Sequence, residues 1–257
     1  MRSLLFVPAV EKMMNKIVGF SADGYVIDLE DSIPLANKQD ALKSLIVFLK
    51  TRPENIFVRL DSALIDDEIK ALKNYDFVGY MLPKFDNPSV YEKYAGEFSR
   101  RQMIALVETP QGMVNVGNIA ACEWIDALAF GAEDYTSCIG MVNNAEMISN
   151  ARSRIVMFGK ANRKFVYDTP SFILNDSEAL ATEIQLAKDM GFDGKLAINP
   201  KHVPVINEIF KSCDVEYIRT IIERYDTVGE AVQVIDGKVY EKMHIDHMKR
   251  ILKENGN

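Results

Sequence analysis

The sequence predicts a (β/α)₈ barrel, also called a TIM barrel, over residues 1–213, followed by a helical extension or lid over residues 214–257. Three observations support this prediction. The chain has 257 residues, about the length of one such barrel plus a short extension. Eight short apolar runs alternate with longer segments whose apolar residues recur at helical spacing. Charged residues gather at the last positions of most runs, where barrels of this class carry their active sites.

Each apolar run has the length and the aliphatic or aromatic composition of a buried strand. In chain order, the expected strands cover residues 4–7, 24–30, 55–60, 78–84, 102–109, 125–134, 164–168 and 194–199. Strands that alternate with helices build a parallel sheet. The alternative is an open, doubly wound sheet, although the chain has no Gly-x-Gly-x-x-Gly turn that would indicate a dinucleotide-binding version.

Between the strands, apolar residues recur three and four positions apart, which is typical of one face of a helix. The expected helices lie near residues 11–18, 35–50, 66–74, 89–98, 111–122, 145–161 and 177–190. Eight repeats are complete by Asn199, so the residues after about Val215 are not needed to close the barrel. This tail is predicted to hold at least one helix and a turn at Asp236–Gly237.

Composition narrows the class of protein. The formal net charge is −7 and the isoelectric point is near 5.2, which argues against a nucleic-acid or anionic-membrane partner. No apolar run reaches the roughly 20 residues needed to cross a bilayer. The three cysteines, Cys122, Cys138 and Cys213, form no Cys-x-x-Cys pair. We therefore expect a cytoplasmic protein with reduced thiols and a small-molecule partner.

Two acidic residues, Glu108 and Asp134, close the fifth and sixth apolar runs. The segment between the two runs is long enough for one helix, so the runs form a β-α-β unit that brings both carboxylates to the carboxyl ends of neighbouring strands. Two hard oxygen ligands without a nearby His or Cys suit Mg²⁺ better than Zn²⁺, with Mn²⁺ as an alternative. The competing interpretation is that each acid caps the helix that follows it.

Other runs also end in charged residues, namely Asp28, Glu30, Asp31, Arg59, Lys84 and Asp168. Polar groups crowded at one end of a barrel are costly to desolvate unless they bind something. The guanidinium of Arg59 is predicted to clamp a substrate carboxylate, the alternative being a plain ion pair. Lys84, which follows Pro83, is a candidate anion or substrate contact.

Eight motifs follow one another along the chain. They are Arg2-Ser-Leu-Leu-Phe-Val-Pro8, Val26-Ile-Asp-Leu-Glu-Asp31, Val58-Arg59, Leu82-Pro-Lys84, Leu106-Val-Glu-Thr109, Phe130-Gly-Ala-Glu-Asp134, Gly191-Phe-Asp-Gly-Lys195 and Ile198-Asn-Pro200. In this order they resemble the citrate lyase β-subunit-like branch of the HpcH/HpaI aldolase/citrate lyase family. The resemblance extends from Arg2 to about Phe210, and the ordered set is far more specific than any one motif.

This resemblance implies a (β/α)₈ barrel that holds Mg²⁺ through Glu108 and Asp134. It also implies that Arg59 holds the substrate carboxylate and that Asp28 supports the metal through water. By the same resemblance, Arg2 lies near a phosphate-bearing carrier, either coenzyme A or an acyl-carrier thioester. The family further implies a homo-oligomer, a trimer or a hexamer.

Together, the charged strand ends and the resemblance predict a Mg²⁺-dependent carbon–carbon lyase. It would cleave or form a bond beside a carbonyl of a small carboxylated hydroxy acid, or of its acyl thioester, through a metal-stabilised enolate. The group that handles the proton is expected among Glu30, Asp31 and Asp168. The alternatives are a class II aldolase that releases pyruvate or oxaloacetate without a carrier, and a non-catalytic barrel subunit.

Three positions depart from the family pattern. Ala9 stands where the family usually has glycine, Asn199 where it usually has histidine, and Glu241 where a tail motif usually ends in aspartate. In relatives that use coenzyme A, that last acid lies on a lid over a neighbouring subunit's site. We therefore expect the tail to form such a lid with Glu241 in the acidic position, the alternative being a helix packed on the outside of the barrel.

Overall fold

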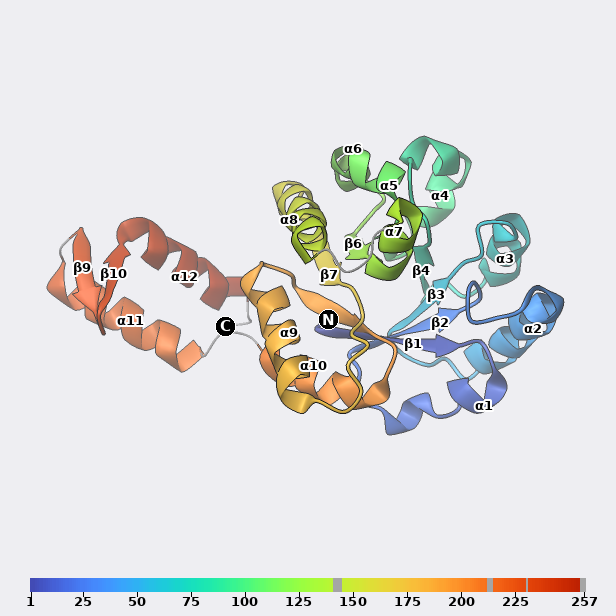
Figure 1. Cartoon of the computed structure of the whole chain (residues 1–257), viewed down its shortest axis with the longest axis horizontal. Helices are drawn as coiled ribbons and strands as arrows, with labels where there is room; N and C mark the ends of the chain where they lie inside the picture. The colour runs from blue at the N-terminus through green and yellow to red at the C-terminus, as the bar shows by residue number, and fades with distance from the viewer. Residues whose placement is uncertain (141–144, 212–214, 230, 255–257) are drawn as a thin grey trace. The chain divides into compact units, whose positions relative to one another are not determined.

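A closed barrel of eight parallel strands, arranged in chain order, forms the larger part of the protein (Figure 1). The computed structural model describes the chain except residues 141–144, 212–214, 230 and 255–257. The strands are β1 (Ser3–Pro8), β2 (Gly24–Asp28), β3 (Ile56–Arg59), β4 (Gly79–Leu82), β5 (Met103–Val107), β6 (Ala127–Phe130), β7 (Phe165–Asp168) and β8 (Gly194–Ala197). β1 pairs with both β2 and β8, which closes the sheet. The predicted (β/α)₈ barrel is confirmed, and the open-sheet alternative is wrong.

Helices surround the strands (Figure 1). The α-helices of this unit are α1 (Glu11–Met14), α2 (Lys38–Leu49), α3 (Ile65–Leu72), α4 (Ala95–Phe98), α5 (Pro110–Val114), α6 (Val116–Ala121), α7 (Ala132–Ile139), α8 (Ala145–Ala161), α9 (Ser177–Asp189) and α10 (Val203–Ile209). Short 3₁₀ helices are η1 (Ile17–Gly19), η2 (Leu35–Asn37), η3 (Pro88–Tyr94) and η4 (Pro200–His202). The single helix predicted near residues 111–122 is instead two helices that meet at Asn115. The Asn115 side chain donates to the carbonyl of Asp86 (2.9 Å), and Gly112 and Gly117 weaken a continuous helix.

Alternate strand residues fill two apolar layers. The barrel interior holds Leu4, Val26, Phe57, Met81, Ile104, Leu106, Ala127, Ala129, Tyr167 and Leu196. Along β2, Val26 belongs to this interior, whereas Tyr25 and Ile27 belong to the layer between the strands and the helices. Because one face of each strand is filled in this way, a shift in register by one residue would expose the interior set. Because all eight strands are parallel, their carboxyl ends emerge together on one side of the barrel.

Residues 211–257 form a second compact unit. It consists of α11 (Val215–Val228), the antiparallel hairpin of β9 (Val232–Ile235) and β10 (Lys238–Glu241), and α12 (Lys242–Glu254). Its own small core contains Ile221, Tyr225, Ile235, Tyr240 and Ile245. The predicted turn at Asp236–Gly237 is present, and both residues have positive φ, as a two-residue hairpin turn requires. The sequence interpretation missed the two strands on either side of that turn.

Three further predictions concern membrane-spanning segments, the cysteines and the boundary between the barrel and the tail. Within the described residues, no helix combines the length and the apolar character needed to cross a bilayer. Cys122 and Cys138 are free thiols, and Cys213 lies outside the described residues. The boundary predicted between residues 213 and 214 also falls outside them, and the two compact units divide between Phe210 and Lys211.

A buried cluster of charges ties helices to the barrel near the end of β7. Asp168, with no exposed surface, accepts two hydrogen bonds from the Arg152 guanidinium at 2.9 Å each. Its Oδ2 also accepts from Lys195 Nζ at 2.6 Å, and that ammonium lies 2.9 Å from Glu183 Oε1. Arg152 comes from α8 and Glu183 from α9, so the cluster links both helices to β7 and β8. Asp168 is therefore fully engaged in ion pairs, which argues against the role of free base that was considered for it.

Replacing Lys195 with methionine is expected to destabilise the fold strongly. The substitution removes the ammonium that pairs with Glu183 and leaves the buried Asp168 paired with Arg152 alone; removing one partner of a buried ion pair typically costs about 3–5 kcal/mol. Urea unfolding followed by circular dichroism measures this loss. The same substitution at Lys43, whose pair with Asp40 is highly exposed, should cost less than about 1 kcal/mol. Equal stability losses in the two variants would contradict the structural role assigned to the cluster.

Candidate functional site

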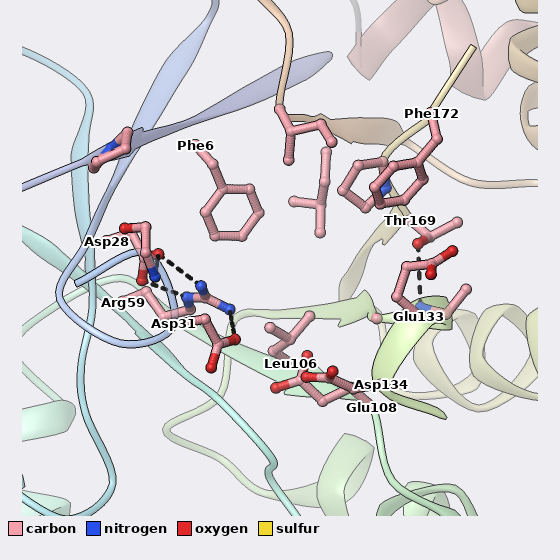
Figure 2. Close-up of a pocket in the computed structure, with 17 residues that line it drawn as sticks. Phe6, Asp28, Asp31, Arg59, Leu106, Glu108, Glu133, Asp134, Thr169 and Phe172 are labelled. Atoms are coloured by element: carbon pink, nitrogen blue, oxygen red, sulfur yellow. Dashed lines mark hydrogen bonds and ion pairs between the residues drawn. The ribbon is translucent and has the colours of Figure 1, made fainter. Parts of the chain in front are cut away.

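A pocket of about 450 Å³ opens at the carboxyl ends of the strands (Figure 2). One part of its lining, the apolar wall, consists of Phe6, Pro8, Leu106, Pro170, Phe172, Leu196 and Ile198. The other part, the acidic wall, consists of Asp28, Asp31, Glu108, Glu133 and Asp134, with Arg59 beside Asp28 and Asp31. A mostly apolar pocket with a few converging charged groups has the character of a small-molecule site.

Arg59, the last residue of β3, is held by carboxylates on its guanidinium edges. Its Nε and Nη2 donate to the two oxygens of Asp28, at 2.7 Å each. Its Nη1 donates to Asp31 Oδ2 at 3.1 Å. The guanidinium also lies 5.0 Å from the ring centroid of Phe6, within the range of a cation–π contact. Arg59 thus forms a bidentate ion pair with the protein's own Asp28, and its role in holding a substrate carboxylate stays a prediction.

Asp28 supports both Arg59 and the turn after β2. Besides the two bonds from Arg59, its oxygens accept the backbone N–H groups of Glu30 (2.9 Å) and Ser32 (3.0 Å). Burial alone would raise the pKa of Asp28, but the hydrogen bonds and charge of Arg59 outweigh burial and hold this pKa below its ordinary value. Four donors fill the acceptor positions of a carboxylate. A water-mediated contact between Asp28 and a metal, as the resemblance implied, would require one of these bonds to be exchanged.

Glu30 and Asp31 follow in the same turn but lie in different environments. Glu30 is buried, and its Oε1 accepts from Lys84 Nζ at 2.5 Å. Its Oε2 lies 3.2 Å from Arg59 Nη1 without the alignment of a hydrogen bond, and has no hydrogen-bond partner among the described residues. Burial raises the pKa of Glu30 despite the opposing effects of Lys84 and Arg59. The Asp31 side chain, by contrast, is 53% exposed.

Lys84 connects Glu30, in the turn after β2, with Glu108, at the end of β5. It follows β4 with a φ of 47°, a left-handed conformation that is unfavourable for a residue with a side chain. In this conformation its backbone N–H donates to Glu108 Oε1 at 2.8 Å while its Nζ reaches Glu30 and lies 4.0 Å from Asp134 Oδ2. Burial opposes the charge, but Glu30 and the neighbouring acids raise the pKa of Lys84. The side chain therefore stays an ammonium and does not act as a Schiff-base nucleophile.

Glu108 lies directly after β5 and is 3% exposed. Burial raises its pKa to about 8, against the effect of the Lys84 N–H, and the charge of nearby Asp134 adds to the increase. Gly131, at the end of β6, makes room for this carboxylate. A Cβ on Gly131 would lie 2.5 Å from Glu108 Oε2, so only glycine fits there without displacing Glu108.

Asp134 was predicted at the end of the sixth strand, but it lies in the first turn of α7, four residues beyond β6. Its side chain is 41% exposed and lines the same pocket as Glu108. The apolar run breaks at Gly131, which ends the strand and precedes the helix. The structure therefore brings the two predicted metal ligands together, although Asp134 comes from a helix.

The donor set suits a hard cation that keeps open coordination positions. No group of three or more His, Cys, Asp or Glu side chains with metal-site geometry occurs among the described residues. Glu108 and Asp134 alone provide two carboxylates, and Mg²⁺ commonly binds through one or two carboxylates together with water and substrate oxygens. Burial raises the pKa of Glu108, and a divalent ion bound to this carboxylate would oppose that effect.

Arg2 is not brought to this pocket. It precedes β1, so it lies at the amino end of the strand, on the opposite side of the barrel from the pocket. Its guanidinium forms a two-point ion pair with Asp23, with N–O distances of 2.9 and 2.7 Å. Its Nη1 donates to the carbonyl of Asn207 at 3.3 Å. These contacts give Arg2 a role in joining the amino end of β1 to its neighbours.

Other residues of the pocket were not predicted from the sequence. Gly131 lies inside the motif Phe130-Gly-Ala-Glu-Asp134, and its position two residues before a pair of acids was a usable signal. Thr169 accepts a hydrogen bond from the Ala132 N–H (3.1 Å), and Figure 2 shows this link between α7 and the loop after β7. Thr169 directly follows a predicted strand end, where such residues are expected. Phe172 lies in a loop, and nothing in its local sequence marked it.

Comparison with known proteins gives a consistent family. Residues 2–200 match the family model described as HpcH/HpaI aldolase/citrate lyase. The citrate lyase subunit beta of Leuconostoc mesenteroides subsp. cremoris is 28% identical over 98% of this chain and 92% of that protein. A (3S)-malyl-CoA thioesterase of Cereibacter sphaeroides is 26% identical over 95% of this chain and 90% of the relative.

A solved structure agrees with these sequence matches. The citrate lyase beta subunit of M. tuberculosis, complexed with oxaloacetate and magnesium, superposes with a TM-score of 0.70. It is 27% identical, and the match covers 81% of this chain and 96% of that chain. This relative therefore shares the barrel as well as the sequence pattern.

Substituting Gly131 with alanine is expected to disturb Glu108. The added Cβ would lie 2.5 and 2.6 Å from Glu108 Oε2 and Cβ, so the side chain or the strand end must shift, at a cost of about 1–3 kcal/mol. Urea unfolding measures this cost. The control is Gly96→Ala in α4, where nothing lies within 4 Å of the new Cβ and stability should be unchanged or slightly higher. Wild-type stability in Gly131→Ala would contradict the close approach.

Proposed function

Because the chain belongs to the HpcH/HpaI aldolase/citrate lyase family, in its citrate lyase β-subunit-like branch, we propose that it is a Mg²⁺-dependent carbon–carbon lyase. The proposed reaction makes or breaks a bond beside a carbonyl of a small carboxylated hydroxy acid or of its acyl thioester. The observation that carries the proposal is the convergence of Glu108, Asp134 and Arg59 on one pocket at the carboxyl ends of the strands.

Glu108 and Asp134 would hold the Mg²⁺ ion. When bound, the ion would act as a Lewis acid on the substrate carbonyl and stabilise the negative charge of the enolate. The acidic wall supports this assignment, because its carboxylates repel one another and favour a cation among them. The M. tuberculosis relative, whose structure contains oxaloacetate and magnesium, supports the same class of ligands.

Arg59 would orient the substrate through its carboxylate. Asp28 holds the Nε and Nη2 edge of the guanidinium, so the plane of Arg59 is already set before a ligand arrives. Asp31, which is half exposed, is the partner that a substrate carboxylate would displace from Nη1. Such preorganisation lowers the entropy lost when the reacting groups are aligned. Lys84, bound to Glu30, would add positive charge beside the same anion.

We assign the proton transfer to Glu30. Burial raises its pKa toward the range useful for a general base, and its Oε2 has no hydrogen-bond partner among the described residues. Glu30 does not itself line the pocket, but Oε2 lies 3.2 Å from Arg59 Nη1, beside the proposed position of the substrate. Asp31 lines the pocket and is the competing candidate.

A second candidate function is a class II aldolase that releases pyruvate or oxaloacetate without a carrier. One observation favours it. Arg2, the residue expected beside a phosphate-bearing carrier, is paired with Asp23 at the other end of the barrel. The name of the C. sphaeroides relative, a malyl-CoA thioesterase, supports the thioester alternative instead.

We further propose that the protein works as a homo-oligomer in which residues 211–257 cover a neighbouring subunit's site. These residues form a compact unit with a core of their own, which is consistent with an element that moves as one body. Glu241 is exposed at the end of β10, where its backbone N–H donates to His244 Nδ1 at 2.9 Å. Its carboxylate would then take the place of the family's lid acid.

The proposed chemistry is tested by the exchange of methyl protons with D₂O, followed by proton NMR, with acetyl-CoA as the substrate for the lyase and pyruvate as the substrate for the aldolase. The lyase passes through the enolate of the acyl thioester and the aldolase through the enolate of pyruvate, so the wild type should accelerate exchange with one of these substrates, and only when Mg²⁺ is present. Glu30→Gln should slow exchange by about a hundredfold or more, whereas Asp31→Asn should retain most of it. No Mg²⁺-dependent exchange of either substrate by the wild type would overturn the proposed function, and the opposite ranking of the variants would transfer the base to Asp31.

Mg²⁺ binding is expected to strengthen as the pH rises. Glu108 must lose its proton before it can bind the ion, and with a pKa of about 8 it is mostly protonated at pH 7 and mostly ionised at pH 9. Calorimetry should therefore show roughly tenfold tighter binding at pH 9 than at pH 7 in the wild type.

The matched control uses another buried glutamate with a pKa of about 8, Glu68 in α3. Glu68→Gln should keep the pH dependence of Mg²⁺ binding, because Glu68 does not line the pocket. Glu108→Gln should lose both the dependence and most of the affinity. Retention of wild-type affinity in Glu108→Gln would remove Glu108 from the metal site.

A further inference from the structure

One buried lysine, Lys38, has no part in the function described so far. It is the first residue of α2 and only 8% exposed, although a lysine is rarely buried without partners. Its Nζ donates to the carbonyl oxygens of Leu29 (2.6 Å) and Glu30 (2.5 Å) and forms an ion pair with Asp61 Oδ2 (2.7 Å). These three acceptors use all three N–H donors of the ammonium.

The contacts of Lys38 complete the restraint of the turn over residues 28–32. The N–H groups of Glu30 and Ser32 are bound by the Asp28 carboxylate, and the carbonyls of Leu29 and Glu30 are bound by Lys38. Both sides of the peptide backbone are therefore fixed, one from β2 and the other from α2. A turn held in this way has little freedom to change the direction of its side chains.

Asp61 extends the restraint to the next loop of the barrel. It follows β3 by two residues, so it lies close behind Arg59 in the chain. Its Oδ1 accepts the Ala63 N–H at 2.8 Å, and its own N–H donates to the buried Glu68 at 2.8 Å. Lys38 thus joins the turn that carries Glu30 to the loop that follows Arg59, through two hydrogen bonds to the turn and one ion pair to the loop.

From this geometry we propose that Lys38 is a positioning residue for the reaction: it sets the placement of Glu30 and Asp31 relative to Arg59 by cross-linking the loops after β2 and β3. The inference rests on the proposed function, because it matters for catalysis only if Glu30 or Asp31 handles the proton. Lys38 does not line the pocket, so its effect reaches the substrate through the backbone of Glu30.

The test compares Lys38→Met with Lys43→Met. Both lysines lie in α2, and Lys43 is highly exposed, so the control applies the same substitution to the same helix without touching the turn. In a folded Lys38→Met variant saturated with Mg²⁺, the maximal rate of proton exchange should fall by about tenfold or more, measured on acetyl-CoA or pyruvate, whichever the wild type accepts. The KM for that substrate and the Mg²⁺ affinity should stay within about twofold, because Arg59, Glu108 and Asp134 remain in place. Lys43→Met should match the wild type.

Hydrogen exchange of the backbone gives a readout that does not depend on turnover. The amides of Glu30 and Ser32 should exchange faster in Lys38→Met, while the amides of β5 and β6 keep their wild-type protection. If Lys38→Met does not fold, Asp61→Asn replaces it, since this variant keeps the side-chain shape and removes the charge that holds Lys38. The expected loss in maximal rate is then about threefold or more.

A folded Lys38→Met or Asp61→Asn variant with the wild-type exchange rate and unchanged amide protection would overturn the inference. A lower melting temperature with an unchanged maximal rate would also overturn it, because that result describes a purely structural residue. If the wild type exchanges the protons of neither acetyl-CoA nor pyruvate, the proposed function fails, and the amide protection of Glu30 and Ser32 still decides whether Lys38 holds the turn.

Discussion

Negative charge crowded at one end of the barrel is the constraint that shapes the site. The acidic wall and Glu30 place six carboxylates around one small pocket, and Arg59 and Lys84 lie against them. The two cations do not compensate all of the carboxylates equally. Arg59 holds the pKa of Asp28 below its ordinary value, whereas burial raises the pKa of Glu108 to about 8. A site in this condition gains free energy by taking up a cation, which is why the geometry supports a metal-dependent reaction.

The arrangement also depends on rigid backbone at the strand ends. Lys84 accepts an unfavourable φ so that one residue can bind Glu108 through its N–H and Glu30 through its side chain. Gly131 leaves the space that the Glu108 carboxylate occupies. Hydrogen bonds from the backbone and from buried charges thus place the functional groups before any ligand binds. In barrels of this class, the strands and helices provide the stability, and the residues at the carboxyl ends of the strands provide the chemistry.

The barrel and much of the site were predictable because they follow from local patterns. Each apolar run marked a strand, and the parallel topology then brought Arg59, Glu108 and the acids after β2 to one end. The ion pairs between charged side chains were not predictable. The sequence could not distinguish Asp168, which is buried and paired with Arg152 and Lys195, from a free base. The position of Arg2 could have been inferred, since a residue before the first strand lies at the amino end of a barrel whose chemistry is at the carboxyl end. The hairpin of the tail was missed because most of its strand residues are exposed, so it lacks the continuous apolar run that marked the barrel strands.

The central claim is that Glu108, Asp134 and Arg59 form one site for a metal ion and an oxo acid. A crystal structure of the protein soaked with Mg²⁺ and oxaloacetate tests it most directly. The account predicts the ion bound to carboxylate oxygens of Glu108 and Asp134, with an oxaloacetate carboxylate on Arg59 in place of Asp31. An ion bound elsewhere, or oxaloacetate ordered away from Arg59 while the Arg59–Asp31 bond persists, would contradict the account.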